Sequence, residues 1–417
     1  MLKFIHAADI HLDSPLLRLE HYEGAPVESL RQATRRAFEN LVRLAIDEQA
    51  DFLLISGDLY DGDWKDYNTG LYLVSQMVKL RDAGIPVCII AGNHDAASRM
   101  TKSLRLPDGV HFFPPEQPTT FCLDDLGVAI HGQSFPRQAV TKELFAGYPP
   151  TVSGYFNIGM LHTCATGREG HEPYAPCTVG GLQSKGYDYW ALGHVHQQEV
   201  LSEDPPIVFP GNIQGRHIRE TGPKGCMRVR VEENGAVTTD FQPLDVIRWT
   251  KLQVDASQTD DGYGVIDSIY GQLESLPGEN HGLPLIARVE VTGASSAHAE
   301  LAADPERWIS EVRSAATDAG NGQVWIEKVR LCTEFPAPPS SGGPVDEVIR
   351  IFDAVRKDPD RLESLGDALS PLWKKLPREL KEGPDAVRPD DADWLAEMLD
   401  QAQPMLLRRL LSRGKGR

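Results

Sequence analysis

The segment Leu2-Lys3-Phe4-Ile5-His6-Ala7-Ala8-Asp9-Ile10-His11 opens the chain with a strand-like apolar run that leads directly into an Asp-x-His motif. Four further apolar runs end in the same way, each at a motif built from Asp, Asn or His. These are residues 52–56 before Gly57-Asp58-x-x-Asp61, 87–91 before Gly92-Asn93-His94-Asp95, 157–161 before His162, and 189–192 before Gly193-His194-x-His196. Ligands bind at the carboxyl ends of parallel strands in open α/β sheets, so we expect the five motifs to meet at one sheet edge.

The motif side chains are of the kind that holds two adjacent divalent metals. Carboxylates and neutral histidines bind ions such as Mn²⁺, Fe²⁺ or Zn²⁺, and an asparagine carbonyl oxygen is a weak neutral ligand. Asp9 and His11 project the same way if the backbone stays extended, as do His194 and His196, and Asp58 is placed to bridge two ions. Taken singly, each residue has an ordinary alternative, a helix cap for an aspartate or a structural role for a histidine. Together they favour a metal pair, and metal pairs mainly hydrolyse phosphate esters.

Helical patterns separate the first strand runs. Apolar residues recur at helical spacing over 30–49 and again over 68–83, and such strand–helix–strand alternation implies right-handed crossovers and a buried sheet. From about residue 108 the pattern becomes strand-rich, with runs at 110–113, 128–130, 207–209 and 227–231. We therefore predict an α/β fold in which a second sheet packs on the first and helices lie outside.

The sequence changes character near residue 245, which ends the first predicted domain, 1–245. Residues 246–335 carry three strand runs and two helical patterns, which predict a small α+β domain. The stretch 336–344 is rich in Pro, Ser and Gly and has the composition of a linker. The C-terminal region, 345–417, contains amphipathic helical patterns, in which Ser370-Pro371 is placed to end one helix and start another.

At 417 residues the chain is long enough for two or three domains, and its 41% hydrophobic and 24% charged residues are typical of a globular protein. No apolar run reaches the roughly 18 residues of a membrane span. The N-terminus enters a strand at once, so we expect no signal peptide and no membrane partner. The six cysteines form no C-x-x-C pair, which fits reduced thiols and a cytoplasmic location.

The formal net charge of −18 argues against a globally basic nucleic-acid binder. It does not exclude a nucleic-acid enzyme, because bound divalent metals supply local positive charge that a residue count omits. Contacts to a phosphate backbone would need local basic patches. The candidates are Arg31, Arg35 and Arg36, then Arg216, Arg219 and Lys224, and the tail residues Arg408, Arg409, Arg413, Lys415 and Arg417. The alternative for each is an ordinary solvated surface.

Taken in order, the motifs D-x-H, G-D-x-x-D, G-N-H-[DE], H and G-H-x-H resemble the signature of the calcineurin-like metallophosphoesterase superfamily, over roughly residues 1–240. Two segments resemble more closely the SbcD-type DNA repair exonucleases, particularly their YhaO-like branch. They are Phe4-Ile5-His6-Ala7-Ala8-Asp9-Ile10-His11-Leu12-Asp13 and Ala129-Ile130-His131-Gly132-Gln133-Ser134-Phe135. This resemblance implies a two-sheet metallophosphoesterase sandwich flanked by helices, followed by a capping domain at 246–335 and C-terminal helices.

The resemblance also implies a role for each motif residue. One metal would be held by Asp9, His11, Asp58 and His196, and the second by Asp58, Asn93, His162 and His194, with Asp58 bridging. His94 would face the scissile phosphate and stabilise charge or protonate the leaving oxygen. Archaeal and eukaryotic relatives carry a histidine where this chain has Asp61, which instead matches the G-D-x-x-D form of the wider superfamily. We therefore interpret Asp61 as the partner that raises the pKa of His94 and fixes its tautomer, the alternative being a loop cap.

Two further residues are candidate substrate contacts. His131 either contacts substrate near the metals or is a buried strand histidine. Arg216 ends the segment Phe209-Pro210-Gly211-Asn212-Ile213-Gln214-Gly215-Arg216, which resembles the loop that these nucleases place beside the site. It is a candidate phosphate contact.

The leading hypothesis is a DNA exonuclease that uses two divalent ions. We expect these ions to be Mn²⁺, with Fe²⁺ or Zn²⁺ as alternatives. A metal-activated hydroxide would attack phosphorus, and His94 would assist. One rival is a small-molecule or cyclic-nucleotide phosphodiesterase on the same core. Another is a non-catalytic scaffold, which the intact Asp58, Asn93 and His94 disfavour. The resemblance implies three partners: DNA, a coiled-coil ABC-type ATPase docked on the C-terminal helices, and a second copy of the chain. The alternative for the helical stripes is packing on their own domain.

Overall fold

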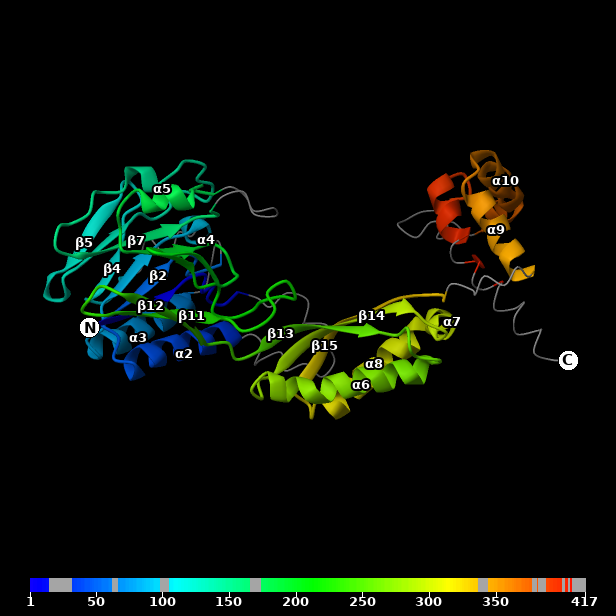
Figure 1. Ribbon diagram of the computed structural model, residues 1–417, viewed down its shortest axis with the longest axis horizontal. Helices are drawn as coiled ribbons and strands as arrows, with labels where there is room; N and C mark the ends of the chain where they lie inside the picture. The colour runs from blue at the N-terminus through cyan, green and yellow to red at the C-terminus, as the bar shows by residue number, and fades with distance from the viewer. Residues whose placement is uncertain are drawn as a thin grey trace. The chain divides into compact units, whose positions relative to one another are not determined.

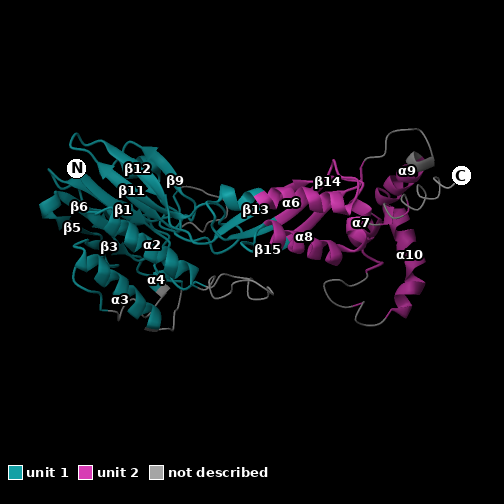
Figure 2. Ribbon diagram, turned by 90° about the horizontal axis from the view of Figure 1, so that it is seen from below, with its two compact units in different colours: residues 1–251, 275–288, 320–328 teal, residues 252–274, 289–319, 329–417 magenta. Residues whose placement is uncertain are grey.

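The computed structural model of the chain describes residues 1–14, 32–61, 67–97, 105–165, 174–336, 344–376, 381, 388–399, 402–403 and 406. The chain forms two compact units (Figure 2). The first comprises residues 1–251, 275–288 and 320–328, and the second comprises 252–274, 289–319 and 329–417. The five motifs of the sequence all lie in the first unit, which is described first.

A six-stranded sheet carries the first three motifs at its strand ends. Its strand order is β12-β11-β1-β2-β3-β4, in which β1 to β4 are parallel and β11 and β12 are antiparallel additions. The strands are β1 (Leu2–Ala7), β2 (Phe52–Ser56), β3 (Val87–Ile90), β4 (Val110–Phe112), β11 (Gly225–Val231) and β12 (Val237–Pro243). Between them run α2 (Ala33–Asp47), α3 (Tyr67–Asp82) and the short α4 (Asn93–Ala97). Figure 1 shows α2 and α3 on one face of this sheet.

A second six-stranded sheet carries the two remaining motifs. Its order is β5-β6-β7-β8-β10-β9, with β6, β7, β8 and β10 parallel. The strands are β5 (Thr119–Leu123), β6 (Val128–Gly132), β7 (Phe156–His162), β8 (Tyr189–Gly193), β9 (Glu199–Glu203) and β10 (Pro206–Phe209). The helix α5 (Val179–Gln183) and two single-turn 3₁₀ helices, Asp124–Leu126 and Phe145–Gly147, complete this part.

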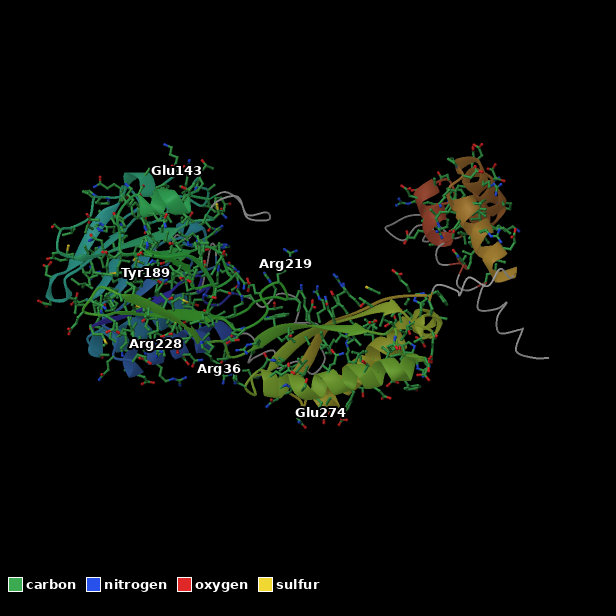
Figure 3. All side chains as sticks on the ribbon, in the orientation of Figure 1. Arg36, Glu143, Tyr189, Arg219, Arg228 and Glu274 are labelled. Atoms are coloured by element: carbon green, nitrogen blue, oxygen red, sulfur yellow. The ribbon has the colours of Figure 1, made fainter. Side chains whose placement is uncertain are left out.

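The two sheets pack face to face, because their inner strands, such as β2, β3, β6 and β8, are buried on both faces. Ile5 and Leu53 pack with Phe38 of α2, whereas Phe4 and Tyr189 meet in the core between the sheets. The rings of Phe4 and Tyr189 are in edge contact at 5.3 Å between centroids, and Tyr189 is labelled in Figure 3. The predicted two-sheet sandwich with outer helices is confirmed.

The placement of two strands differs from the expectation. The runs at 110–113 and 227–231 were expected in the second sheet, but β4 pairs with β3 and β11 pairs with β1, so both belong to the first sheet. The five motif strands likewise divide between two sheets rather than sharing one edge. Apolar alternation identifies a strand but not its partner, because pairing is decided by contacts far apart in sequence. His6 of β1 links the sheets, with Nδ1 3.0 Å from Tyr189 Oη and Nε2 3.1 Å from the Leu192 carbonyl oxygen.

The predicted α+β region forms a three-stranded sheet with helices on one face (Figure 1). Its elements are β13 (Arg248–Asp255), α6 (Gly262–Glu279), β14 (Leu285–Ala294), α7 (His298–Ala303), α8 (Pro305–Ala319) and β15 (Val324–Glu334). The core of this region includes the buried side chains of Val254 in β13, Ile269 in α6 and Trp308 in α8. The helix α7 was not expected. The division between the compact units passes through this sheet, so the boundaries at 245 and 335 stay predictions.

The C-terminal region contains α9 (Pro344–Arg356), α10 (Pro359–Lys375) and a further helix at 392–399. Asp358 caps α10 by accepting hydrogen bonds from the backbone N–H groups of Asp360 and Arg361. The expectation of a helix restart at Ser370-Pro371 is wrong, since α10 continues through Pro371. Residues 337–343 of the predicted linker lie outside the described residues, as do Arg31 and the basic tail residues 408–417. Within the described ranges, no helix combines the length and apolar character that crossing a membrane requires.

Candidate metal centre

The backbone of the first motif is held against that of the second. The Asp9 N–H donates to the Gly57 carbonyl oxygen at 3.0 Å, and the His11 N–H donates to the Asp58 carbonyl oxygen at 3.0 Å. Asp9, His11 and Asp58 all have left-handed backbone, with φ of 51°, 46° and 52°. The extended backbone expected at Asp9 and His11 is therefore wrong, and their side chains are aimed by two strained turns. Such strain in non-glycine residues is typical of functional sites.

Glycines permit the close approach of the motif loops. A Cβ at Gly193 would collide with the Ser56 carbonyl oxygen, and one at Gly92 would collide with the Asp58 carboxylate. Gly57 combines a φ of 95° with a similar conflict against the ring of His162. The glycines of these three motifs therefore let ligands from both sheets meet at one point.

The structure brings the predicted metal ligands together from both sheets. Three groups have ligand atoms within 4.8 Å of one another: Asp9, His11 and His196; Asp58, His162 and His194; and His11, Asp58 and His94. Asn93 joins the second group, with Oδ1 3.0 Å from His162 Nε2 and 3.2 Å from His194 Nδ1. The first two groups consist of residues from the two implied ligand sets, and the third, which includes His94, connects them through His11 and Asp58.

The distances between donor atoms fit shared metal ions. His11 Nε2 lies 3.2 Å from His196 Nε2, and Asp58 Oδ2 lies 3.4 Å from His162 Nε2. Two ligand atoms that each lie about 2.0–2.2 Å from the same ion are separated by roughly the distances seen here. Asp9 and Asp58 are each only 1% exposed. Two buried carboxylates so close together repel each other unless a cation lies between them.

Hydrogen bonds to the outer ring nitrogens set the histidine tautomers. His162 Nδ1 donates to the Ser56 carbonyl oxygen at 2.9 Å, and His196 Nδ1 donates to Glu220 Oε1 at 2.7 Å. In both rings Nε2 is left with its lone pair facing the ligand group. A carbonyl or carboxylate behind a metal-binding histidine is the usual arrangement that fixes its orientation.

Burial and neighbouring charges perturb the ionisation of the site. Burial raises the pKa of Asp9 to about 6, although the nearby His196 and His162 oppose this. Burial lowers the pKa of His11 to about 3, which keeps the ring neutral as a ligand must be. At Asp58 burial opposes ionisation, yet His162 and His11 hold the pKa of the carboxyl well below its usual range.

His94 and Asp61 form the pair predicted from the second and third motifs. Nδ1 of His94 lies 3.1 Å from Asp61 Oδ1, and Ser14 Oγ donates to Asp61 Oδ2 at 2.7 Å. The hydrogen bond that His94 donates to Asp61 raises the pKa of His94. The His94 side chain is 36% exposed, whereas those of His11 and His162 are fully buried. It is therefore placed to reach a bound phosphate ester, while the other two are placed to hold metal.

Sequence reasoning assigned no role to two carboxylates that organise the site. Asp95 accepts hydrogen bonds from the backbone N–H groups of Leu59, Tyr60 and Gly92, and so joins the second and third motif loops. The sequence contained one indication of this role, because Asp95 is the last residue of the third motif. Glu220 supports His196 but lies far beyond the last motif, and no local spacing identifies it.

The two candidate substrate contacts have different environments. His131 is fully buried in β6, with Nδ1 2.8 Å from Thr120 Oγ1 and Nε2 3.1 Å from Asn157 Oδ1. Both ring nitrogens are occupied, which matches the buried strand histidine rather than a substrate contact. Arg216 lies beside the site, with Nη1 3.9 Å from Asp61 Oδ1 and Nη2 3.4 Å from Glu220 Oε1.

Known proteins share both parts of this architecture. Residues 2–198 match the calcineurin-like phosphoesterase family, and residues 249–334 match the middle domain of metallophosphoesterase YhaO. The chain is 35% identical over 298 residues to the uncharacterized metallophosphoesterase YhaO of Bacillus subtilis, covering 70% of this chain and 72% of that one. The chain belongs to the YhaO-like branch of the calcineurin-like metallophosphoesterases. This YhaO-like protein is thus a metal-dependent phosphoesterase, and the scaffold alternative is not supported.

More distant relatives of this YhaO-like protein include a DNA repair protein. The DNA double-strand break repair protein Mre11 of Methanopyrus kandleri is 27% identical over 273 residues. The alignment covers 58% of this chain and 57% of that relative, so this chain matches little more than half of it. A solved dimetal phosphatase from Danio rerio is 13% identical, with a TM-score of 0.35 over 58% of this chain and 99% of that one.

Proposed function

We propose that this YhaO-like phosphoesterase hydrolyses DNA phosphodiester bonds as an exonuclease that uses Mn²⁺. The observation that carries the proposal is the partly exposed His94, held by Asp61 beside two buried ligand groups. The similarity to an archaeal Mre11, a DNA double-strand break repair protein, supports DNA as the substrate class. The free thiols of all six cysteines fit the cytoplasmic location that we propose with it.

The ligand groups and His94 divide the chemistry between them. When bound, two divalent ions supply a water-derived nucleophile at neutral pH and neutralise charge on the phosphate. The Asp61 carboxylate holds Nδ1 of His94, so that Nε2 is the ring atom left to donate a proton to the leaving oxygen. A deoxyribose alkoxide is a poor leaving group, and this proton transfer is therefore the step for which His94 is needed.

Exposed arginines offer a test that distinguishes a DNA substrate from a small ester. Among the basic candidates, Arg216 and Lys224 are engaged in hydrogen bonds, whereas Arg36 and Arg219 are exposed (Figure 3). A DNA backbone needs such contacts beyond the scissile bond, and a small ester does not. We expect Arg219→Ala to weaken DNA hydrolysis and to leave hydrolysis of p-nitrophenyl esters unchanged.

The deciding experiment compares substrates with purified protein and Mn²⁺. End-labelled single- and double-stranded DNA, a cyclic nucleotide and p-nitrophenyl esters are offered in parallel, with Asp58→Ala and His94→Ala as controls for contamination. Release of labelled nucleotide that both substitutions abolish would support the exonuclease. Turnover of the small esters alone would instead support a small-molecule phosphodiesterase, which the net charge of −18 favours over a polyanionic substrate.

The C-terminal helices are the proposed site for a protein partner. Ile351 of α9 and Leu372 of α10 are 51% and 60% exposed, so each helix presents an apolar side chain to solvent. We propose that a coiled-coil ABC-type ATPase docks there and that the protein also pairs with a second copy. Ile351→Glu and Leu372→Glu should abolish co-purification with such an ATPase and leave ester hydrolysis intact. Sedimentation equilibrium tests the homodimer.

A further inference from the structure

Glu220 is a buried carboxylate at the back of the metal centre. Its side chain is 5% exposed, and Oε1 accepts the hydrogen bond from His196 Nδ1 at 2.7 Å. Its other oxygen, Oε2, accepts from Asn212 Nδ2 at 2.9 Å and from the Arg216 backbone N–H at 2.7 Å. Arg216 Nη2 lies 3.4 Å from Oε1. Glu220 is therefore fixed in place independently of the histidine that it contacts.

A second side chain holds the backbone of the same histidine. Lys224, also 5% exposed, donates from Nζ to the His196 carbonyl oxygen at 2.8 Å. The loop 211–224 thus holds His196 at two points, its ring and its carbonyl group. A Cβ at Gly211, whose φ is 78°, would press on the His196 carbonyl oxygen, so the loop follows this backbone closely.

The loop is itself supported by the segment that leads into β13. Trp249 Nε1 donates to the Gly215 carbonyl oxygen at 2.9 Å, and the Gly222 N–H donates to the Trp249 carbonyl oxygen at 3.1 Å. The side-chain amide of Gln214 bonds the backbone of Val246 and Ile247. The position of Glu220 is therefore set by packing that does not involve the metal ligands.

We propose that Glu220 is a positioning residue that aligns His196 Nε2 for the first metal ion and sets the affinity of that ion. The inference rests on the two-metal centre and does not require DNA as the substrate. A carboxylate on Nδ1 selects the tautomer with a free Nε2 lone pair and increases its basicity. Loss of such a partner typically weakens metal affinity by about 10–100-fold.

The test is isothermal titration calorimetry of the metal-free protein with MnCl₂. Glu220→Gln should weaken one of two binding events by about tenfold or more and leave the other unchanged. The matched control is Glu327→Gln, because Glu327 of β15 is 8% exposed and accepts from Arg288 as Glu220 does from Arg216. This control should bind both ions as the wild type does. A wild-type protein that binds two Mn²⁺ ions but cuts no DNA would count against the proposed substrate and not against this role of Glu220.

A second variant ties the effect to His196. In the His196→Ala background, Glu220→Gln should cause no further loss of affinity, since the ring that it aligns is absent. Glu220→Asp retains the negative charge but places it farther from the His196 ring. Its Mn²⁺ affinity should therefore lie between those of the wild type and Glu220→Gln. Normal Mn²⁺ affinity in Glu220→Gln, or equal losses in Glu220→Gln and Glu327→Gln, would overturn the proposal in favour of a purely structural role.

Discussion

Asp61 Oδ1 lies 3.1 Å from Nδ1 of His94, and the same oxygen lies 3.5 Å from Nδ1 of His11. One carboxylate oxygen therefore faces both a candidate metal ligand and the histidine placed to reach substrate. The two neighbouring histidines hold the pKa of Asp61 well below its usual range. A histidine at position 61 could not supply this negative charge to both rings.

This relationship predicts coupled effects of His94 and Asp61 on catalysis. His94→Ala should lower kcat/KM for DNA by about 10²–10⁴-fold, because the leaving alkoxide loses its proton donor. The loss should be smaller for p-nitrophenyl esters, whose leaving group departs without a proton. Asp61→Asn should cause a smaller loss, and the double variant should be no slower than His94→Ala alone.

Steady-state kinetics on both substrates measure these effects. Glu290→Gln serves as the control, because it removes a partly buried, arginine-paired carboxylate of β14. Glu290→Gln should not change the ratio of kcat/KM for DNA to kcat/KM for the p-nitrophenyl ester. Additive losses for Asp61→Asn and His94→Ala would show that the two residues act independently.

Elements with strong local patterns could be predicted closely from the sequence. The run at residues 52–56 has the bounds of β2, and the apolar run that opens the chain at Leu2 forms β1. The strands themselves depend on local periodicity, which a single sequence carries. The motif residues also meet, although from two sheets and not at the single sheet edge that was expected.

Other features depend on contacts that no local pattern encodes. The pairing of β11 with β1 joins residues more than 200 positions apart, and Glu220 supports His196 from 24 positions away. The left-handed turns at Asp9 and His11 are imposed by hydrogen bonds to the second motif loop. Proline inside a helix usually breaks or kinks it. In α10, however, the helix that Asp358 caps at its start continues through Pro371.

The close approach at Gly193 predicts a large effect of a single methyl group. Gly193→Ala should destabilise the fold by about 1–3 kcal/mol and weaken Mn²⁺ binding, because the new Cβ would push the motif away from the Ser56 carbonyl group. Gly271→Ala in α6 is the control, since its Cβ would meet no atom within 4 Å. That variant should gain about 0.5–1 kcal/mol from helix propensity. Urea unfolding measures both, and equal stability of the two variants would contradict the prediction.

Metal removal should destabilise the protein in proportion to the metal bound. An ion that binds only the folded state stabilises it by about 2.7 kcal/mol at a concentration of 100 times its Kd. Dialysis against EDTA should therefore lower Tm, and MnCl₂ should restore it. Asp58→Asn should abolish the Mn²⁺ response, because this residue joins both ligand groups. Asp245→Asn, which removes a buried carboxylate paired with Arg248, should lower Tm and keep the response.

His6 predicts how the stability of the metal-free protein depends on pH. Burial lowers the pKa of His6 to about 3 in the folded state, against the usual histidine value of 6.5 in the unfolded chain. Between these values the unfolded chain binds the extra proton, so the contribution is complete above pH 6.5 and is lost as the pH falls. The loss should be about 1.4 kcal/mol per pH unit below 6.5. Urea unfolding in EDTA at pH 7.5, 5.5 and 4.5 should show a shallower acid slope for His6→Gln, which cannot titrate. Parallel slopes would mean that His6 is protonated as readily in the folded protein as in the unfolded chain.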